Sequence, residues 1–236
     1  MVDLGRRSPA LELMDTEHVS FAEFDECLRH IAAINRISLA YRPTLRWLDD
    51  VVAGKPKNAL LTILDVGSGQ GDMLRRVAEW AKRRGVAVRL SGVDLNPWSA
   101  IAAQAATPPE LPIRFETGDV FAWRPGEHVD VVISSLFTHH LPDDALVAFL
   151  RWMSTVASEG WFVNDLHRHP LPYHTVRLAA RMLPVNRMVK HDAPLSVARA
   201  FTRADWLEAI SRAGLDPASV SVGWWFPFRF GIGWRR

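Results

Sequence analysis

The residues best suited to do chemistry lie in one short segment, Asp65–Asp72, which reads DVGSGQGD. Its glycines at 67, 69 and 71 permit tight turns and let backbone N–H groups approach a ligand closely. A dinucleotide-binding loop would need glycine at position 72, which is Asp72, and a phosphate loop would need Gly-Lys-Ser/Thr, which is absent. The next helix N-terminus would favour a negative group, such as a carboxylate.

Two further acidic residues stand near the ends of apolar segments. Asp94 closes the segment 88–95, and Asp119 lies near the end of the segment 113–120. Either residue alone is most simply a cap of a helix or a turn. With Asp65 they make three acids at the ends of three successive expected strands, which favours a shared ligand site at one edge of a sheet.

The elements that must position these residues alternate between strands and helices. The expected strands are 60–67, 88–95, 113–120, 129–136, 160–166, 219–225 and 228–234. The expected helices between the first five strands are 71–85, 97–106 and 142–158. This alternation predicts an α/β, Rossmann-like, doubly wound sheet, mainly parallel, with an antiparallel final strand. The last two runs are an antiparallel pair or one bent edge strand.

Apolar residues at helical spacing also flank this core. They predict helices over 21–52, with a second helix starting at Pro43, and over 172–183 and 202–213. A turn or linker is expected at 54–58. We therefore expect a helical cap at 1–58, a ligand-binding core at 59–236 and a helical lid at about 168–200. The basic, apolar stretch 173–190 could instead lie on a membrane surface, but Pro184 interrupts it.

Composition limits the classes of function. The chain has 236 residues, a formal net charge of +2 and one cysteine, Cys27. A disulfide framework and a thiolate metal cluster are therefore excluded within the chain, and no basic footprint for nucleic acid stands out. The sequence has no apolar run long enough to span a membrane and no signal-peptide pattern, so we expect a cytoplasmic protein. We also expect a monomer or homodimer.

The motifs LDVGSGQGD (64–72), GVDLN (92–96), TGDV (117–120) and DVVISSLFTHHL (130–141) stand in a fixed order over the core. They resemble those of class I S-adenosylmethionine-dependent methyltransferases. The closest similarity is to the bacterial small-molecule branch related to quinone-biosynthesis enzymes, which segments 164–171 and 189–206 also resemble. The resemblance implies an enzyme with S-adenosylmethionine as cofactor and S-adenosylhomocysteine as product.

The resemblance also implies roles for individual residues. The cofactor-binding residues that it implies are Asp65, Gly67, Ser68, Gly69, Gln70, Gly71, Asp94, Leu95, Asp119, Val120, Ser134, Ser135 and Leu136. The glycine loop would line the methionyl end, Asp94 would accept both ribose hydroxyls, and Asp119 would bond the adenine amino group. The three residues 134–136 would lie under the sulfonium. Trp98 and Phe137 are aromatic candidates for contact with the cofactor.

Histidines are concentrated after the fourth and fifth strands. His140 is the favoured proton acceptor, followed by His167 and His139, because imidazole takes a proton near neutral pH. Any one of them could instead be a surface or structural histidine. Adjacent residues usually point to different faces, so His139 and His140 are expected to differ in role. His167 and His169 could form a metal pair, but no third ligand follows, and we expect no metal.

The expected function is methyl transfer to a small aromatic or lipophilic acceptor, with oxygen favoured over nitrogen or carbon. A catalytically inactive cofactor-binding protein of the same fold is the alternative. A nucleic-acid methyltransferase is disfavoured because Ser134–Phe137 replaces the Asn/Asp-Pro-Pro-Tyr tetrad. An oxidoreductase is disfavoured by Asp72.

Overall fold

One mixed sheet organises the chain, with its strands in the order β3-β2-β1-β4-β5-β7-β6. The computed structural model describes residues 2–56, 59–124 and 126–236. The strands are β1 (Leu60–Val66), β2 (Ala87–Asp94), β3 (Ile113–Thr117), β4 (Val129–Ser135), β5 (Ala157–Leu166), β6 (Val220–Trp225) and β7 (Arg229–Arg235). The pairs from β3 to β5 are parallel, and β7 is antiparallel to both β5 and β6. The predicted fold class is confirmed.

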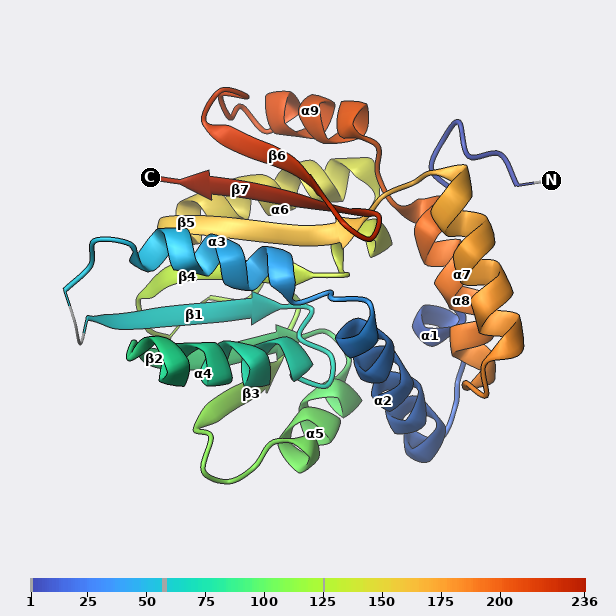
Figure 1. Ribbon diagram of the computed structural model, residues 1–236, viewed down its shortest axis with the longest axis horizontal. Helices are drawn as coiled ribbons and strands as arrows, with labels where there is room; N and C mark the ends of the chain where they lie inside the picture. The colour runs from blue at the N-terminus through green and yellow to red at the C-terminus, as the bar shows by residue number, and fades with distance from the viewer. Residues whose placement is uncertain (1, 57–58, 125) are drawn as a thin grey trace.

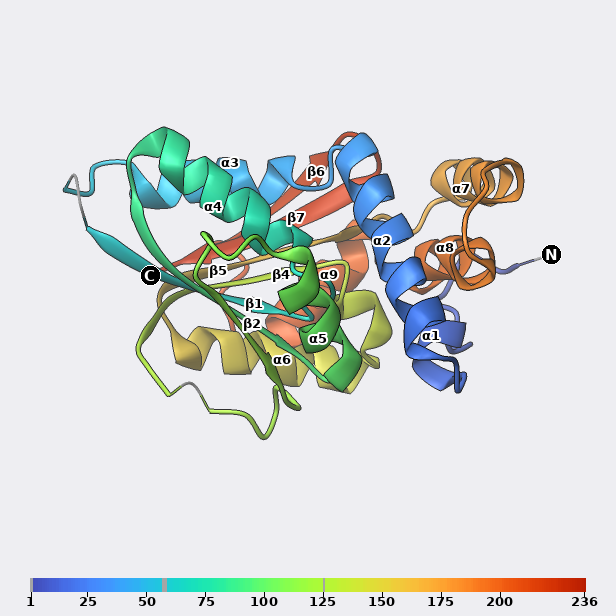
Figure 2. The same ribbon diagram turned by 90° about the horizontal axis from the view of Figure 1, so that it is seen from below.

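Helices cover both faces of this sheet (Figure 2). α3 (Arg42–Val52) and α4 (Asp72–Arg84) lie on one face, and α6 (Asp143–Val156) and α9 (Arg203–Arg212) lie on the other. α5 (Pro97–Ala106) packs along β2 and β3. Side chains of β1 alternate between the two layers, so that Leu64 joins the core under α6 and Ile63 joins the core under α3. A central parallel strand that is covered on both faces needs apolar residues at nearly every position.

The remaining helices gather beyond the carboxyl ends of the parallel strands. They are α1 (Leu13–Thr16), α2 (Phe21–Ile37), α7 (Pro170–Met182) and α8 (Arg187–Arg199). In Figure 1 the arrowheads of β1 and β5 point towards this group. Ligands of open parallel sheets bind at that edge. The N-terminal segment and the α7–α8 pair are therefore placed to cover a site that the strands present.

Local signals explain where the helices begin and end. The Ser20 hydroxyl accepts the Glu23 N–H and starts α2, and Pro43 stands in the first turn of α3. Gly85 closes α4 in the left-handed region, with a φ of 67°. The two predicted helices of 21–52 are confirmed, with a break at residues 38–41.

Some expected boundaries were wrong. β3 ends at Thr117 rather than at 120, because the chain turns after Gly118, where the Asp119 carbonyl oxygen accepts the Ala122 and Trp123 N–H groups. β5 begins at Ala157, three residues earlier than expected. α8, which contains Pro194, lies within the helical lid expected at about 168–200, although no separate helix was predicted there. The last two runs form an antiparallel pair, which settles the alternative left open by the sequence.

The division into a cap at 1–58 and a core at 59–236 stays a prediction, and its expected turn falls partly on 57–58, outside the described residues. Helix α3 belongs to the sheet layers, because Trp47 stacks on Phe162 of β5. Among the described helices, none has the length and apolar character needed to cross a bilayer.

Candidate active site

The glycine loop follows β1 and leads directly into α4. Gly67 and Gly71 have φ angles of 70° and 72°. A Cβ added at Gly67 would lie 2.7 Å from the Phe137 ring, and one at Gly71 would lie 2.5 Å from the Phe115 ring. Only glycine combines this backbone conformation with such close neighbours. The loop therefore lies at the carboxyl edge of the sheet, with Gly67 and Gly69 half-buried and Gly71 buried.

Asp94 stands beside this loop at the end of β2. Its Oδ2 accepts the Gly69 N–H at 2.9 Å, and its Oδ1 accepts the Asn96 N–H at 3.0 Å. Burial raises the pKa of Asp94, and these hydrogen bonds oppose that rise. Each carboxylate oxygen keeps acceptor capacity. The side chain is therefore held in one orientation and can accept two more donors, such as vicinal hydroxyls.

The expected adenine side of the site is partly open. Leu95 is 72% exposed next to Asp94. Asp119 lies in the turn after β3, where its Oδ1 accepts the Phe121 N–H at 3.0 Å, and Val120 is buried. The Trp98 ring packs edge-on against Phe21 and Phe24 of α2, with centroids 6.1 and 5.8 Å away. Trp98 therefore joins α5 to the roof made by α2, and its contact with a cofactor stays a prediction.

Among the residues that the structure describes, buried polar atoms without a hydrogen-bond partner lie in a row on the face of the sheet that α3 covers. They are Asp65 Oδ1 on β1, Ser135 Oγ on β4 and Asn164 Oδ1 on β5. Ser135 and Asn164 are register partners. Burying a polar group without a hydrogen bond reduces the stability of the fold by about 1–3 kcal/mol. Such a row therefore indicates a place where a ligand could supply the hydrogen bonds. A polar ligand bound along this row could form a hydrogen bond with each of these atoms.

A small cavity connects this row to the glycine loop. Its lining residues are Asn35, Ala40, Tyr41, Asp65, Gly67, Ser68, Asp72, Met73, Ser135 and Leu136. Burial raises the pKa of Asp65 well above its usual range, and the charges of Asp72 and Asp94 raise it further. Gln70 and Ser68 of the loop are also buried. The cavity thus has acidic and hydroxyl walls beneath the loop backbone.

The turn after β4 is held from both sides. The Ser134 hydroxyl donates to the Val66 carbonyl at 2.9 Å, and the Leu136 N–H donates to the Asn164 carbonyl at 2.9 Å. Leu136 has a φ of 56°, which is uncommon for a residue with a side chain. Such backbone conformations persist where the surroundings enforce them, and they cluster at functional sites.

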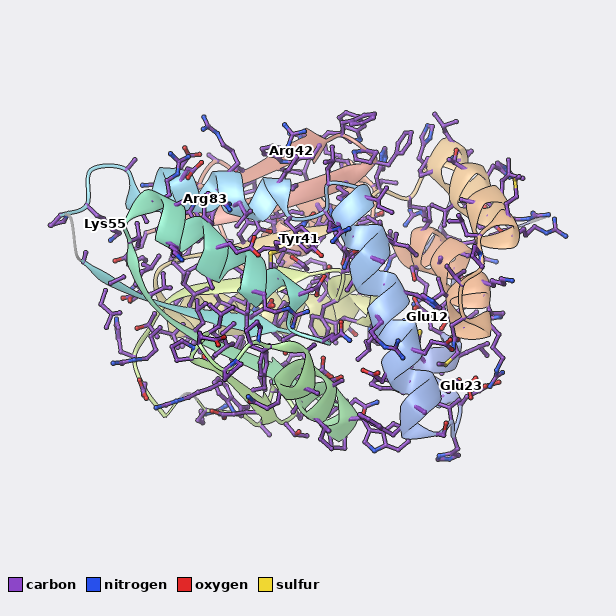
Figure 3. All side chains as sticks on the ribbon, turned by 60° about the horizontal axis from the view of Figure 1, so that its bottom comes forward. Glu12, Glu23, Tyr41, Arg42, Lys55 and Arg83 are labelled. Carbon is purple, nitrogen blue, oxygen red and sulfur yellow. The ribbon has the colours of Figure 1, made fainter. Side chains whose placement is uncertain are left out.

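Helix α2 and the start of α3 close the site from above. The Tyr41 hydroxyl donates to Asp72 Oδ2 at 2.8 Å, and Asn35 Nδ2 donates to the same oxygen at 3.2 Å. Figure 3 marks Tyr41 where α2 leads into α3, over the start of α4. Asn164 Nδ2 donates to the Ala40 carbonyl at 2.6 Å. Sequence reasoning missed Asn35, Tyr41 and Asn164, although a polar residue inside the apolar run of β5 was a signal.

Arg229 was also missed. It begins β7 opposite Leu166 and is 4% exposed. Its Nη2 donates to Ser38 Oγ at 3.1 Å, but Nε and Nη1 are buried without a partner. Burial lowers the pKa of Arg229 to about 10, against the opposing charges of Asp165 and Tyr41. A charged guanidinium with two free donors is a ready partner for an anionic oxygen.

His139 and His140 lie side by side rather than on opposite faces, and the expected difference in their roles stays a prediction. Both lie in the short 3-10 helix η1 (Thr138–His140), which brings their ring centroids within 4.4 Å. His139 Nδ1 lies 2.7 Å from Asp165 Oδ1, and His140 Nδ1 lies 2.8 Å from Asp15 Oδ2. The tight turn after β4 overrides the alternation expected of an extended chain.

His167 differs from that pair. Its Nδ1 is buried without a partner, and its ring packs edge-on against Phe230 at 4.8 Å. Burial lowers the pKa of His167, and the neighbouring His169 and Arg168 lower it further. The ring is therefore neutral near pH 7, which suits a proton acceptor. The catalytic roles of His139, His140 and His167 stay predictions.

Comparison with known proteins adds independent findings. Residues 63–160 match the model of a methyltransferase domain. Trans-aconitate 2-methyltransferase of Mycobacterium ulcerans (strain Agy99) is 30% identical over 137 residues, which are 57% of this chain and 48% of the relative. The enzyme of Mycobacterium tuberculosis (strain ATCC 25177 / H37Ra) is 31% identical over 139 residues, with the same coverage. The chain spans about half the length of the curated relatives it matches.

Solved structures share the fold. Human N-acetylserotonin methyltransferase in complex with S-adenosylmethionine matches with a TM-score of 0.64 at 17% identity, over 92% of this chain and 56% of that chain. Magnesium protoporphyrin IX methyltransferase from Synechocystis PCC 6803, with bound S-adenosylhomocysteine, matches with a TM-score of 0.56 at 16% identity, over 94% and 89%. At these identities the likeness shows the fold alone.

Proposed function

We propose that the chain is a class I S-adenosylmethionine-dependent methyltransferase, and the match of residues 63–160 to a methyltransferase domain supports this. The proposed reaction is transfer of the sulfonium methyl group to an oxygen of a small aromatic or lipophilic acceptor. The observation that carries this proposal is the row of unpartnered polar atoms of Asp65, Ser135 and Asn164 beneath the glycine loop. These groups, together with the doubly anchored Asp94 carboxylate, match a ligand with amino, carboxylate and hydroxyl groups.

The polar groups of the site suit the cofactor, but the cavity in this structure is too small to contain it. The cavity beside the loop has a volume of about 30 Å³, room for little more than a water molecule. Leu28 of α2 would lie 3.8 Å from a Cβ at Gly69, so the roof rests on the loop. We therefore propose that α1 and α2 move away from the loop when the cofactor enters, which is a common task of lids over active sites.

The cofactor supplies an electrophilic methyl group when it is bound. The protein then contributes alignment of the acceptor oxygen with the methyl–sulfur bond and exclusion of water. Asp94 would accept hydrogen bonds from the ribose hydroxyls of the cofactor, and Asp65 would help to orient its amino group. The backbone turn at Leu136, close to Phe137, would define where the reacting oxygen can approach.

Arg229 supports an acceptor with an acidic oxygen. Its two free donors lie at the carboxyl end of β5, where they could hold a carboxylate or a phenolate. A carboxylate is already ionised near neutral pH, whereas a phenol must lose a proton. His167 stays a predicted proton acceptor for that step, although its ring packs on Phe230, which alternates with Arg229 along β7.

Calorimetry with S-adenosylhomocysteine tests the cofactor half of this proposal. The pure protein should bind one equivalent, and Asp94→Ala should weaken binding at least about 100-fold, since two charge-assisted hydrogen bonds are lost. Glu127→Ala, a solvent-exposed acid that pairs with Arg89 and Arg114, is the control and should bind normally. Absence of binding by the wild-type protein at high ligand concentration would sink the methyltransferase proposal.

A product screen tests the acceptor half. Phenols, quinols and lipophilic aromatic acids should be offered with S-adenosylmethionine, and methylated products identified by mass spectrometry. Methylation at oxygen is expected. Methylation only at nitrogen or carbon would retain the methyltransferase and overturn the choice of acceptor atom. A methylated quinol would support the quinone-related branch that the motifs resemble.

A further inference from the structure

A buried cluster of ligating side chains lies beside the turn after β4. Glu12 is 2% exposed, His139 is 3% exposed, and His140 is partly buried. One ligand atom from each residue lies within 4.8 Å of those of the other two. Figure 3 marks Glu12 between α2 and the α7–α8 pair, so the cluster joins the N-terminal segment to the edge of the sheet.

The two imidazoles are oriented in the same way. Asp165 Oδ1 lies 2.7 Å from His139 Nδ1, and Asp15 Oδ2 lies 2.8 Å from His140 Nδ1. Each carboxylate accepts a hydrogen bond from Nδ1–H of a neutral imidazole, which leaves the lone pair on Nε2. Both Nε2 atoms then face Glu12, at 3.6 Å from Oε1 for His139 and 3.9 Å from Oε2 for His140. A carboxylate behind each imidazole is the usual outer shell of a metal-bound histidine.

The spacing also suits a metal ion. Ligand atoms about 2.0–2.1 Å from a tetrahedral ion lie about 3.3 Å from one another. The separations of 3.6 and 3.9 Å are close to this value, and they are too long for hydrogen bonds. Small side-chain rotations would therefore bring all three ligands onto one ion, with a fourth position left for water or another ligand.

The charges around the cluster favour a cation. Glu12, Asp15 and Asp165 face the two imidazoles, and Arg199 Nε lies 3.8 Å from Glu12 Oε1, so three negative charges face one positive charge when the imidazoles are neutral, a net of −2. Arg7 lies nearby but pairs with Asp143. The Ser196 hydroxyl donates to Oε1 at 2.9 Å, and a carboxylate oxygen can accept this bond and still bind an ion.

We propose that Glu12, His139 and His140 form a site for one divalent transition-metal ion of the zinc, cobalt or iron type. Two nitrogens and one carboxylate oxygen suit these ions better than magnesium or calcium, which prefer oxygen ligands only. The sequence-based expectation of no metal considered only the pair His167 and His169, because Glu12 is far away in the chain. The proposal does not depend on methyl transfer.

Metal titration of the full chain tests the site. After treatment with a chelator, the protein should bind one equivalent of Co²⁺ with the visible absorption of a four- or five-coordinate ion, and Zn²⁺ should displace it. Glu12→Gln and His140→Gln should each weaken binding at least about tenfold. His128→Gln, which changes an exposed histidine at the start of β4, is the matched control and should bind normally. Zn²⁺ should also raise the Tm of the wild-type protein but not of Glu12→Gln.

Several results would overturn the proposal. They are no specific Co²⁺ spectrum, or a spectrum that Glu12→Gln and His140→Gln leave unchanged. If the buried Glu12 variant fails to fold, His140→Gln alone decides, because that ring is 21% exposed and tolerates replacement better. Anomalous diffraction at the zinc edge from soaked crystals gives a further decision: a peak among the three residues supports the site, and a peak elsewhere contradicts it.

Discussion

Two buried aspartates, on the strands β1 and β5 that flank β4, have opposite surroundings. Asp65 on β1 is 2% exposed, and its Oδ1 has no partner among the described residues. Asp165 on β5 is fully buried, and it accepts from the Thr138 hydroxyl, the His139 N–H and the Leu166 N–H. The Asp65 carboxylate thus lacks hydrogen-bond donors, whereas the Asp165 carboxylate accepts several. We interpret the surroundings of Asp65 as a ligand site and those of Asp165 as a cluster stabilised by its own hydrogen bonds.

The pKa values follow the same division. Burial raises the pKa of Asp65, and nearby carboxylates add to the effect. Burial also acts to raise the pKa of Asp165, but His139 and the hydrogen bonds outweigh it and lower the pKa to about 2. Asp65 therefore favours folding below about pH 4 and opposes it as the pH rises through its raised pKa. Asp165 favours folding above about pH 4 and loses this contribution as the pH falls towards 2.

The largest expected effect comes from Asp165→Asn. Removing the charge weakens the buried hydrogen bonds from the Thr138 hydroxyl and from the His139 and Leu166 N–H groups, and a hydrogen bond to a charged group contributes about 1.5–3 kcal/mol. Urea unfolding at neutral pH should show this loss in the free energy of unfolding. A change below about 1 kcal/mol would mean that the saturated cluster does not stabilise the fold.

Asp65→Asn makes the same chemical change, but we expect it to change the free energy of unfolding in the opposite direction. Removal of a buried, unpaired charge should stabilise the cofactor-free protein by about 1–2 kcal/mol at neutral pH. The gain should disappear below about pH 4, where the wild-type carboxyl is protonated in both states. Affinity for S-adenosylhomocysteine should fall at the same time. Destabilisation at neutral pH would show that the Asp65 carboxylate has a stabilising hydrogen-bond donor in the folded protein.

Much of this layout could be predicted from the sequence, and the missing part has a physical cause. The strands, the glycine loop and the acids at the strand ends follow from local patterns, since alternating hydrophobicity and glycine spacing are read within a few residues. Glu12, Tyr41 and Arg229 were not predicted as site residues. Each reaches its place through tertiary packing, as when Tyr41 bonds Asp72 over a separation of 31 residues.

The rigidity of the glycine loop can be tested against a loop without close neighbours. Gly67→Ala places a Cβ 2.7 Å from Phe137 at a positive φ, and should cost about 2–4 kcal/mol of stability. Gly54→Ala has a φ of 83° but nothing within 4 Å, so only the backbone penalty of about 1–2 kcal/mol applies. Thermal unfolding of both variants measures the difference. Equal losses would mean that Phe137 moves aside easily.

Arg229→Met tests the part of the candidate site that is proposed to bind the methyl acceptor. The change removes the two free donors but keeps much of the packing, so the KM for an acidic acceptor should rise about tenfold or more. The affinity for S-adenosylhomocysteine should change little, because Arg229 is not among the residues that line the cavity beside the glycine loop. Steady-state kinetics with charged and uncharged acceptors distinguishes recognition of an anion from a structural role. An equal rise for both acceptors would assign Arg229 to packing.

The smallest effect is expected from Tyr41→Phe at the roof. Loss of the hydroxyl removes its 2.8 Å hydrogen bond to Asp72, which should cost about 1 kcal/mol in the free energy of unfolding. Asn35 still donates to the same carboxylate, so the anchor of the roof is weakened rather than lost. If opening of the roof limits entry of the cofactor, stopped-flow binding should become faster while the fold remains intact. Slower or unchanged entry would show that the contact between Tyr41 and Asp72 is formed in both states, so that the roof moves about another hinge.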